Sequence, residues 1–132
     1  MSPLVRELKS EHSQLLQIFN EVKNVGLQSV AGKDKLVSAK DIFINHLNKE
    51  DESLYPVLEE KAKGDSKLMS LLETFAKDMS EITKHTLDFF EKYKGDGFGA
   101  GFENDFTELY GEISGRIRKE ESILYEEYEK CM

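Results

Sequence analysis

The chain has 132 residues, of which 39% are hydrophobic and 33% are charged. This balance suits a helical protein with one core and is too apolar for disorder, so we expect a single domain over residues 1–132. The formal net charge of −8 argues against nucleic acid as a partner, and no apolar run approaches the length that spans a bilayer. Without an apolar leader and with a single cysteine, the protein is expected in the cytoplasm and not at a membrane.

The first predicted helix begins close to the amino terminus. Ser2 followed by Pro3 is typical of a capped helix start, and Gly26 marks the end of the helix. Between them an inward stripe keeps helical spacing and includes a histidine: Leu4, Leu8, His12, Leu15, Phe19 and Val22.

A second helix is predicted from about Asp34 to Gly64. Its inward stripe also contains polar residues: Leu36, Ala39, Phe43, His46, Glu50, Leu54 and Val57. Pro56 falls inside this helix. Because proline removes a backbone hydrogen bond, we expect a bend about one turn before it.

Two further helices complete the predicted fold. The third is capped by Asp65 or Ser66, and its stripe is Leu68, Leu71, Phe75, Met79, Ile82, His85, Phe89 and Tyr93. The glycine-rich segment 95–101 is expected to be a flexible connection, because no strand precedes it as in a phosphate-binding loop. The fourth helix runs from Phe102 to Glu129, with the stripe Phe102, Phe106, Leu109, Ile113, Arg116, Glu120 and Ile123 or Leu124. The fold class is therefore all-α, an antiparallel up-and-down four-helix bundle.

Polar residues interrupt all of these stripes near the middle of the helices. Mid-helix positions of such a bundle lie at the same height, so these side chains should converge in one layer: His12, His46, Glu50, His85, Arg116 and Glu120. His46 and Glu50 are four residues apart and share one helical face, where they can bind one metal together. Imidazole combined with carboxylate favours iron, manganese or zinc over calcium or magnesium.

The alternative to a metal site is a set of hydrogen-bonded core residues. A single histidine on an apolar face is more often such a residue than a metal ligand. Two glutamates change this balance, because a buried ionised carboxylate costs several kcal/mol unless it is paired. Arg116 can neutralise one glutamate but not both, so a metal site is the better interpretation.

The two halves of the chain resemble each other. Three residues of the second helix recur in the fourth at a shift of 70 residues, and a histidine recurs at a shift of 73. The pairs are His46 with Arg116, Glu50 with Glu120, Tyr55 with Tyr125, and His12 with His85. Each half would form a helical hairpin, and two hairpins would bury a shared core around a pseudo-twofold axis. Tyr55 and Tyr125 are expected to pack with their hydroxyl groups near the bundle rim, with a redox or ligand role as the alternative.

On these residues the chain resembles the hemerythrin-like HHE cation-binding family. The family pattern is a helix with one histidine and then a helix with His-x-x-x-Glu, repeated twice. The resemblance covers Leu4 to about Tyr128 and is most specific in HLNKEDESLYP. It implies two non-haem irons, with the following ligands: His12 and His46 on one iron, His85 on the other, and Glu50 and Glu120 as bridges. It also implies oxygen binding or sensing, or the handling of nitric oxide, peroxide or iron.

One ligand of the family pattern is missing. Arg116 stands where a sixth ligand, a histidine, is expected, and a guanidinium stays protonated and offers no lone pair. Three outcomes remain open. The site holds one metal with Arg116 paired to a glutamate, or two metals with a further ligand such as Glu81 or a tyrosine, or no metal. We expect a metal-bearing but asymmetric site.

We therefore expect a non-haem iron protein that binds or senses O₂ or a related small oxidant, with one or two irons. Manganese and zinc are the alternative metals. A metal-dependent enzyme that handles peroxide or nitric oxide is a second reading, in which the metal would supply the catalysis. A metal-free interaction module that kept the bundle and lost the chemistry is a third. The sequence indicates no particular protein partner.

Overall fold

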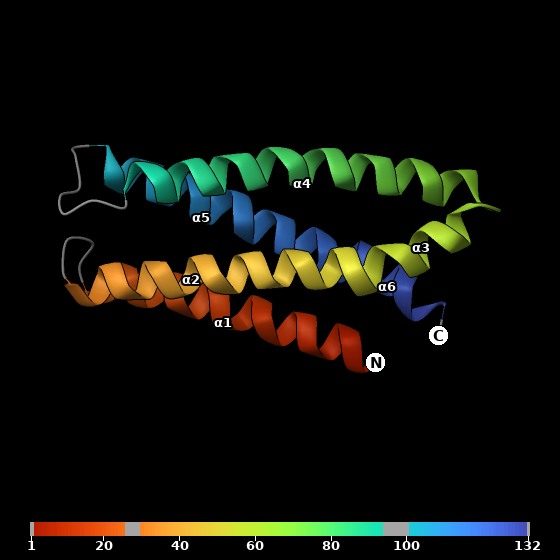
Figure 1. Ribbon diagram of the computed structural model, residues 1–132, viewed down its shortest axis with the longest axis horizontal. Helices are drawn as coiled ribbons and strands as arrows, with labels where there is room; N and C mark the ends of the chain where they lie inside the picture. The colour runs from red at the N-terminus through yellow and green to blue at the C-terminus, as the bar shows by residue number, and fades with distance from the viewer. Residues whose placement is uncertain (1, 26–29, 94–100, 132) are drawn as a thin grey trace.

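The computed structural model describes residues 2–25, 30–93 and 101–131. In these ranges, four long helical segments pack antiparallel as a bundle (Figure 1). The first segment is α1 (Pro3–Val25), and the third is α4 (Ser66–Lys92). The second segment consists of α2 (Val30–Lys49), the π-helical turn η1 (Glu50–Leu54) and α3 (Tyr55–Ala62). The fourth consists of α5 (Phe102–Lys119), the π-helical turn η2 (Glu120–Leu124) and α6 (Tyr125–Glu129). The predicted all-α four-helix bundle is confirmed.

The bundle is made of two helical hairpins. α1 packs along α2 in the first hairpin, and α4 packs along α5 in the second (Figure 1). α2 begins at Val30, one turn before the predicted start near Asp34. Gly32 therefore lies within the first turn of this helix, which tolerates it at a cost of about 1 kcal/mol. The predicted helix end at Gly26 and most of the predicted connection, residues 95–100, lie outside the described residues.

Two hydrophobic clusters fill the core, and they lie on opposite sides of a polar layer. In α1, Leu8 belongs to one cluster and Leu15 to the other, with buried His12 between them. In the fourth segment, Ile113 and Leu124 belong to different clusters and enclose the buried layer residues Arg116 and Glu120. The layer expected halfway along the bundle is therefore present, although its members differ in part from the predicted ones.

The buried face of α4 follows most of the predicted stripe but differs from it at two positions. Leu72 is buried where Leu71 was predicted, and Thr86 is buried where His85 was predicted. The adjacent pair Leu71 and Leu72 allows either register, so apolar spacing alone does not decide between them. Thr86 can be buried without an outside partner because its hydroxyl donates to the carbonyl of Ile82 in the same helix at 2.7 Å.

The two π-helical turns occupy equivalent places in the two hairpins. In each turn, the backbone N–H of a tyrosine donates to the carbonyl of the glutamate five residues earlier, Tyr55 to Glu50 and Tyr125 to Glu120. Residues five apart point about 140° away from each other on a regular α-helix. A π turn closes between residues i and i+5 and brings them to the same side, so Glu120 and Tyr125 both reach the core.

The predicted bend before Pro56 coincides with η1. Proline is not the common cause of the two turns, however, because Glu126 stands at the equivalent place after η2. π-helical turns of this kind are frequent at functional sites.

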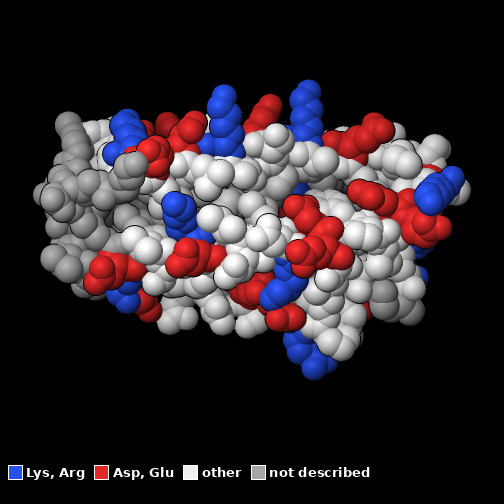
Figure 2. Space-filling model, viewed as in Figure 1, with Lys and Arg blue, Asp and Glu red and all other residues white. Residues whose placement is uncertain are grey.

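The outer surface carries charges of both signs. On the face seen in Figure 2, acidic and basic side chains are interspersed along the helices. Within the described parts of the chain, a membrane-spanning helix is not found: none is both long and apolar enough.

Candidate metal centre

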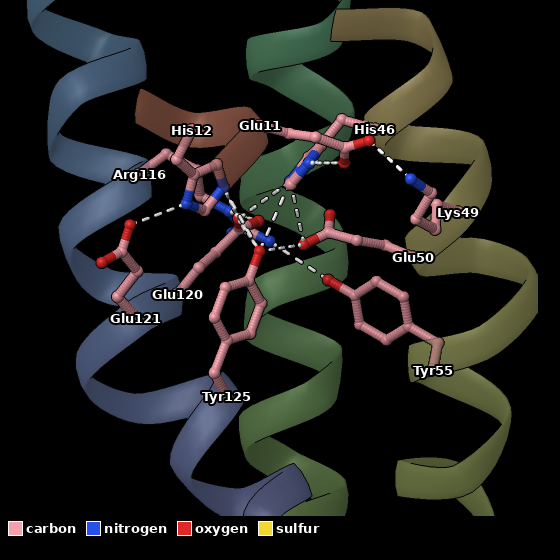
Figure 3. Close-up of polar contacts among 10 residues, drawn as sticks. All are labelled: Glu11, His12, His46, Lys49, Glu50, Tyr55, Arg116, Glu120, Glu121 and Tyr125. Carbon is pink, nitrogen blue, oxygen red and sulfur yellow. Dashed lines mark hydrogen bonds and ion pairs between the residues drawn. The ribbon is translucent and has the colours of Figure 1, made fainter. Parts of the chain in front are cut away.

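Four buried side chains from three helical segments meet in the polar layer. They are His12 of α1, His46 of α2, Glu50 of η1 and Glu120 of η2. Each offers one nitrogen or oxygen donor, and these four atoms all lie within 4.8 Å of one another. We call this set the donor cluster (Figure 3).

The imidazoles and carboxylates of the donor cluster touch one another directly. Nε2 of His12 lies 3.0 Å from Oε1 of Glu120. Nε2 of His46 lies 3.3 Å from Oε2 of Glu50 and 3.8 Å from Oε1 of Glu120. The predicted i, i+4 pair of His46 and Glu50 therefore faces inward as one unit.

The outer nitrogen of each histidine is held by a further glutamate. Nδ1 of His12 lies 2.9 Å from Glu121, and Nδ1 of His46 lies 2.9 Å from Glu11, which also accepts from Lys49 (Figure 3). Carboxylates in this position fix the ring orientation and leave Nε2 free to face the donor cluster. Sequence reasoning missed Glu11 and Glu121, because both contacts run between helices and only the fold reveals them.

Arg116 occupies the place of the sixth family ligand and is fully engaged. Its Nε donates to Oε2 of Glu120 at 2.9 Å, and its Nη1 donates to the carbonyl of Phe75 at 3.0 Å. Its Nη2 donates to the hydroxyl of Tyr55 at 3.2 Å, and the guanidinium lies over the Phe75 ring, 4.6 Å from its centroid. With only 4% of its surface exposed, Arg116 places a permanent positive charge beside the donor cluster.

Tyr125 reaches the middle of the donor cluster and not the predicted rim (Figure 3). Its hydroxyl lies 2.8 Å from Oε2 of Glu50 and 3.2 Å from Oε1 of Glu120. It also lies 3.2 Å from Nε2 of His12 and 3.4 Å from Nε2 of His46. Tyr55, its counterpart in the first half, contacts Arg116 instead.

Two predicted site residues on α4 stay outside the donor cluster. The side chain of His85 is 57% exposed, and its Nδ1 lies 3.1 Å from Oε2 of Glu112. Glu81 is also exposed. The prediction that His85 lies on the buried stripe is wrong, because the neighbouring Thr86 takes the buried position and turns His85 outward.

The pairing of His12 with His85 in the internal repeat is corrected by the same observation. Inward positions of α1 recur in α4 at a shift of 67 residues, not 73. The pairs are Val5 with Leu72, Leu8 with Phe75, His12 with Met79, Leu15 with Ile82, Phe19 with Thr86 and Val22 with Phe89. α4 therefore presents Met79 to the layer where α1 presents a histidine.

The surroundings in the layer shift the pKa values of the two glutamates in opposite directions. Burial alone would raise the pKa of Glu120, but hydrogen bonds from His12 and His46 and the charge of Arg116 hold its pKa well below the ordinary value. Burial and the charge of Glu120 raise the pKa of Glu50. Burial would lower the pKa of His46, yet its bonds to Glu120 and Glu50 outweigh this and raise the pKa to about 10.

The residues present fit a metal ion. Oε1 of Glu50 is buried and has no hydrogen-bond partner among the described residues, which is costly for a carboxylate. A cation among the four donors would offset the charge of the two buried carboxylates, Glu50 and Glu120. Two imidazoles with two carboxylates are a donor set suited to iron, manganese or zinc.

A small cavity adjoins the donor cluster. It measures about 20 Å³, which is room for one water-sized molecule. His12, His46, Arg116 and Glu120 line it together with apolar side chains that include Met79 and Ile82.

Comparison with known protein families agrees with this site. The family model described as "Hemerythrin HHE cation binding domain" matches residues 3–128, nearly the whole chain. No curated protein and no solved structure matches the chain significantly.

Proposed function

Because the chain belongs to the hemerythrin HHE cation-binding family, we propose that its donor cluster holds one non-haem iron, which binds O₂ or a related small oxidant. The observation that carries the proposal is the convergence on one point of four buried donors, two of which are carboxylates. A cation that lies between two buried carboxylates stabilises both of them.

The arrangement of the second half of the site supports a single metal. Arg116 pairs with Glu120 where the family pattern has a histidine, so a fixed guanidinium already supplies positive charge there. α4 offers the apolar side chains Met79 and Ile82 at the cavity, and His85 lies outside. With neither imidazole in place, the second half lacks the donors to hold another metal ion.

Iron is the metal that best combines this donor set with a small apolar cavity. Bound ferrous iron supplies an open coordination position and the ability to change oxidation state. The protein residues hold the donors, keep Nε2 of each histidine inward and limit the adjoining space to about one small molecule. Manganese or zinc would occupy the same donors but would not serve reversible binding of O₂.

Nitric oxide provides a direct test, because it binds ferrous iron and reports on it by electron paramagnetic resonance. The protein is loaded with ferrous iron under nitrogen, and nitric oxide is added in steps. We expect a new signal that reaches its maximum at one nitric oxide per bound iron. An iron-loaded protein whose spectrum does not respond would contradict the role in binding small oxidants.

The cavity offers a matched pair of variants for the same measurement. Ile82 lines both the cavity and a neighbouring surface groove. We expect Ile82→Phe to slow the binding of nitric oxide roughly tenfold by narrowing the entry, and Ile82→Ala to speed it. Both variants should keep the same iron content, since Ile82 offers no donor atom. Equal rates in all three proteins would show that the ligand does not enter through this cavity.

A further inference from the structure

The geometry points to Tyr125 as a fifth ligand of the metal ion, bound through its phenol oxygen. The inference rests on the proposed function, that is, on an iron ion within the donor cluster. It adds an anionic oxygen donor that the family's pattern of histidines and glutamates does not contain.

The distances around Tyr125 are compatible with those between neighbouring ligands of one metal ion. With metal–donor bonds of about 2.1 Å, neighbouring donors at right angles lie about 3.0 Å apart, and opposite donors about 4.2 Å apart. The Tyr125 oxygen lies 2.8–3.4 Å from all four donor-cluster atoms. An atom at neighbour distance from four other donors is placed where it can share one metal ion with them.

The single proton of the Tyr125 hydroxyl does not satisfy this position. A phenol has one proton to donate, yet the Tyr125 oxygen faces carboxylate oxygens of both Glu50 and Glu120 at short range. The phenol proton can therefore serve only one of these oxygen pairs, and the other pair needs a second proton or a cation. A metal ion bound to all three oxygens removes this conflict, because each oxygen then directs a lone pair at the cation.

The backbone aims Tyr125 at this point. η2 brings a residue five positions after Glu120 onto the same side of the helix, and the Tyr125 side chain is only 1% exposed. η1 does the same for Tyr55, but that hydroxyl meets the guanidinium of Arg116. The equivalent tyrosine thus contacts a cation in each half: a fixed one for Tyr55, and the proposed metal for Tyr125.

Binding is a simple exchange at the Tyr125 oxygen. The O–H bond breaks, the oxygen–metal bond forms with the electron pair of the oxygen, and the proton leaves to solvent.

Two carboxylates and a phenolate, offset by Arg116, then give the protein groups a net charge of about −2, which favours the ferric over the ferrous ion. The cavity is lined by His12, His46 and Glu120 but not by Tyr125, so ligation leaves the space for an oxidant open.

The visible spectrum of the ferric protein tests the inference, because a phenolate bound to ferric iron gives an intense charge-transfer band in the visible range. We expect this band in the wild type, with tyrosine ring vibrations enhanced in the resonance Raman spectrum. Tyr125→Phe should abolish the band and raise the reduction potential. Tyr55→Phe is the matched control, since it removes the equivalent hydroxyl from the other half, and it should leave the band intact.

The iron content of each protein separates the two proposals. A wild type with one iron and no visible band would overturn the inference but leave the proposed function standing, with Tyr125 displaced when the metal binds. A band that persists in Tyr125→Phe would also overturn it. If Tyr125→Phe fails to hold iron, wild-type protein grown with 3-fluorotyrosine decides the matter, because an unmoved band excludes a tyrosine ligand. A wild type that takes up no iron would remove both proposals.

Discussion

At the scale of single residues, Arg116 has the largest effect on the site. It stands in the repeat where His46 stands in the first half, and it repeats the same i, i+4 contact to a glutamate, Arg116 to Glu120 and His46 to Glu50. The guanidinium thus keeps the contact to the glutamate in the second half. It offers no lone pair, so it cannot coordinate a metal.

Restoring the second half requires two imidazoles. Arg116→His alone should leave the iron content at one per chain, because α4 still presents Met79 in the place that corresponds to His12. The double variant Met79→His with Arg116→His should raise the content toward two, as measured by metal analysis after anaerobic loading. Arg116→His combined with His85→Gln is the control and should stay at one. Two irons in Arg116→His alone would show that another residue completes the second site.

The sequence was sufficient to predict most of the donor cluster but not all of its surroundings. His12, His46, Glu50 and Glu120 were predictable because polar residues on an apolar stripe must converge inside a bundle. His85 could not be assigned correctly, because either of the neighbouring residues 85 and 86 fits the spacing of the stripe. The contact of Tyr125 depends on η2, and no proline or glycine near residue 125 signals that turn.

At the scale of helical elements, η1 and η2 are paired features of the two hairpins. Each begins at a glutamate of the polar layer and ends just before a tyrosine, so each presents both side chains to the interior. Pro56 revealed η1 in the sequence, whereas Glu126 gives no such signal for η2. An irregularity in the second segment was therefore predictable, and the π-helical turn in the fourth was not.

Proline substitutions test whether the π turns exist independently of Pro56. Pro56→Ala should change the free energy of unfolding by less than about 1 kcal/mol, because the turn in the other half forms without proline. Glu126→Pro, at the equivalent position, should be tolerated at a similarly small cost. Glu59→Pro, inside α3, should cost about 3 kcal/mol, as proline does within a regular helix. Urea unfolding measures all three, and an equal loss in Glu126→Pro and Glu59→Pro would contradict the account.

At the scale of the whole molecule, two hydrophobic clusters enclose the polar layer. Apolar packing above and below holds the helices in place, so the layer can contain two glutamates and a guanidinium without opening to water. The fold could be predicted, because helical periodicity and helix-breaking residues can be recognised in the sequence. The burial of Leu72 and Thr86 in place of their neighbours depends on side-chain packing and on the internal hydrogen bond of Thr86, which periodicity does not encode.

The most direct test of the central claim is the amount of iron bound per chain after anaerobic loading and removal of free metal. The claim is that buried histidines and glutamates of the donor cluster hold one ion. We expect one iron per chain in the wild type, a loss of at least tenfold in affinity in His46→Gln, and no change in the exposed control His85→Gln. No iron or two irons in the wild type, or an equal loss in the two variants, would contradict it.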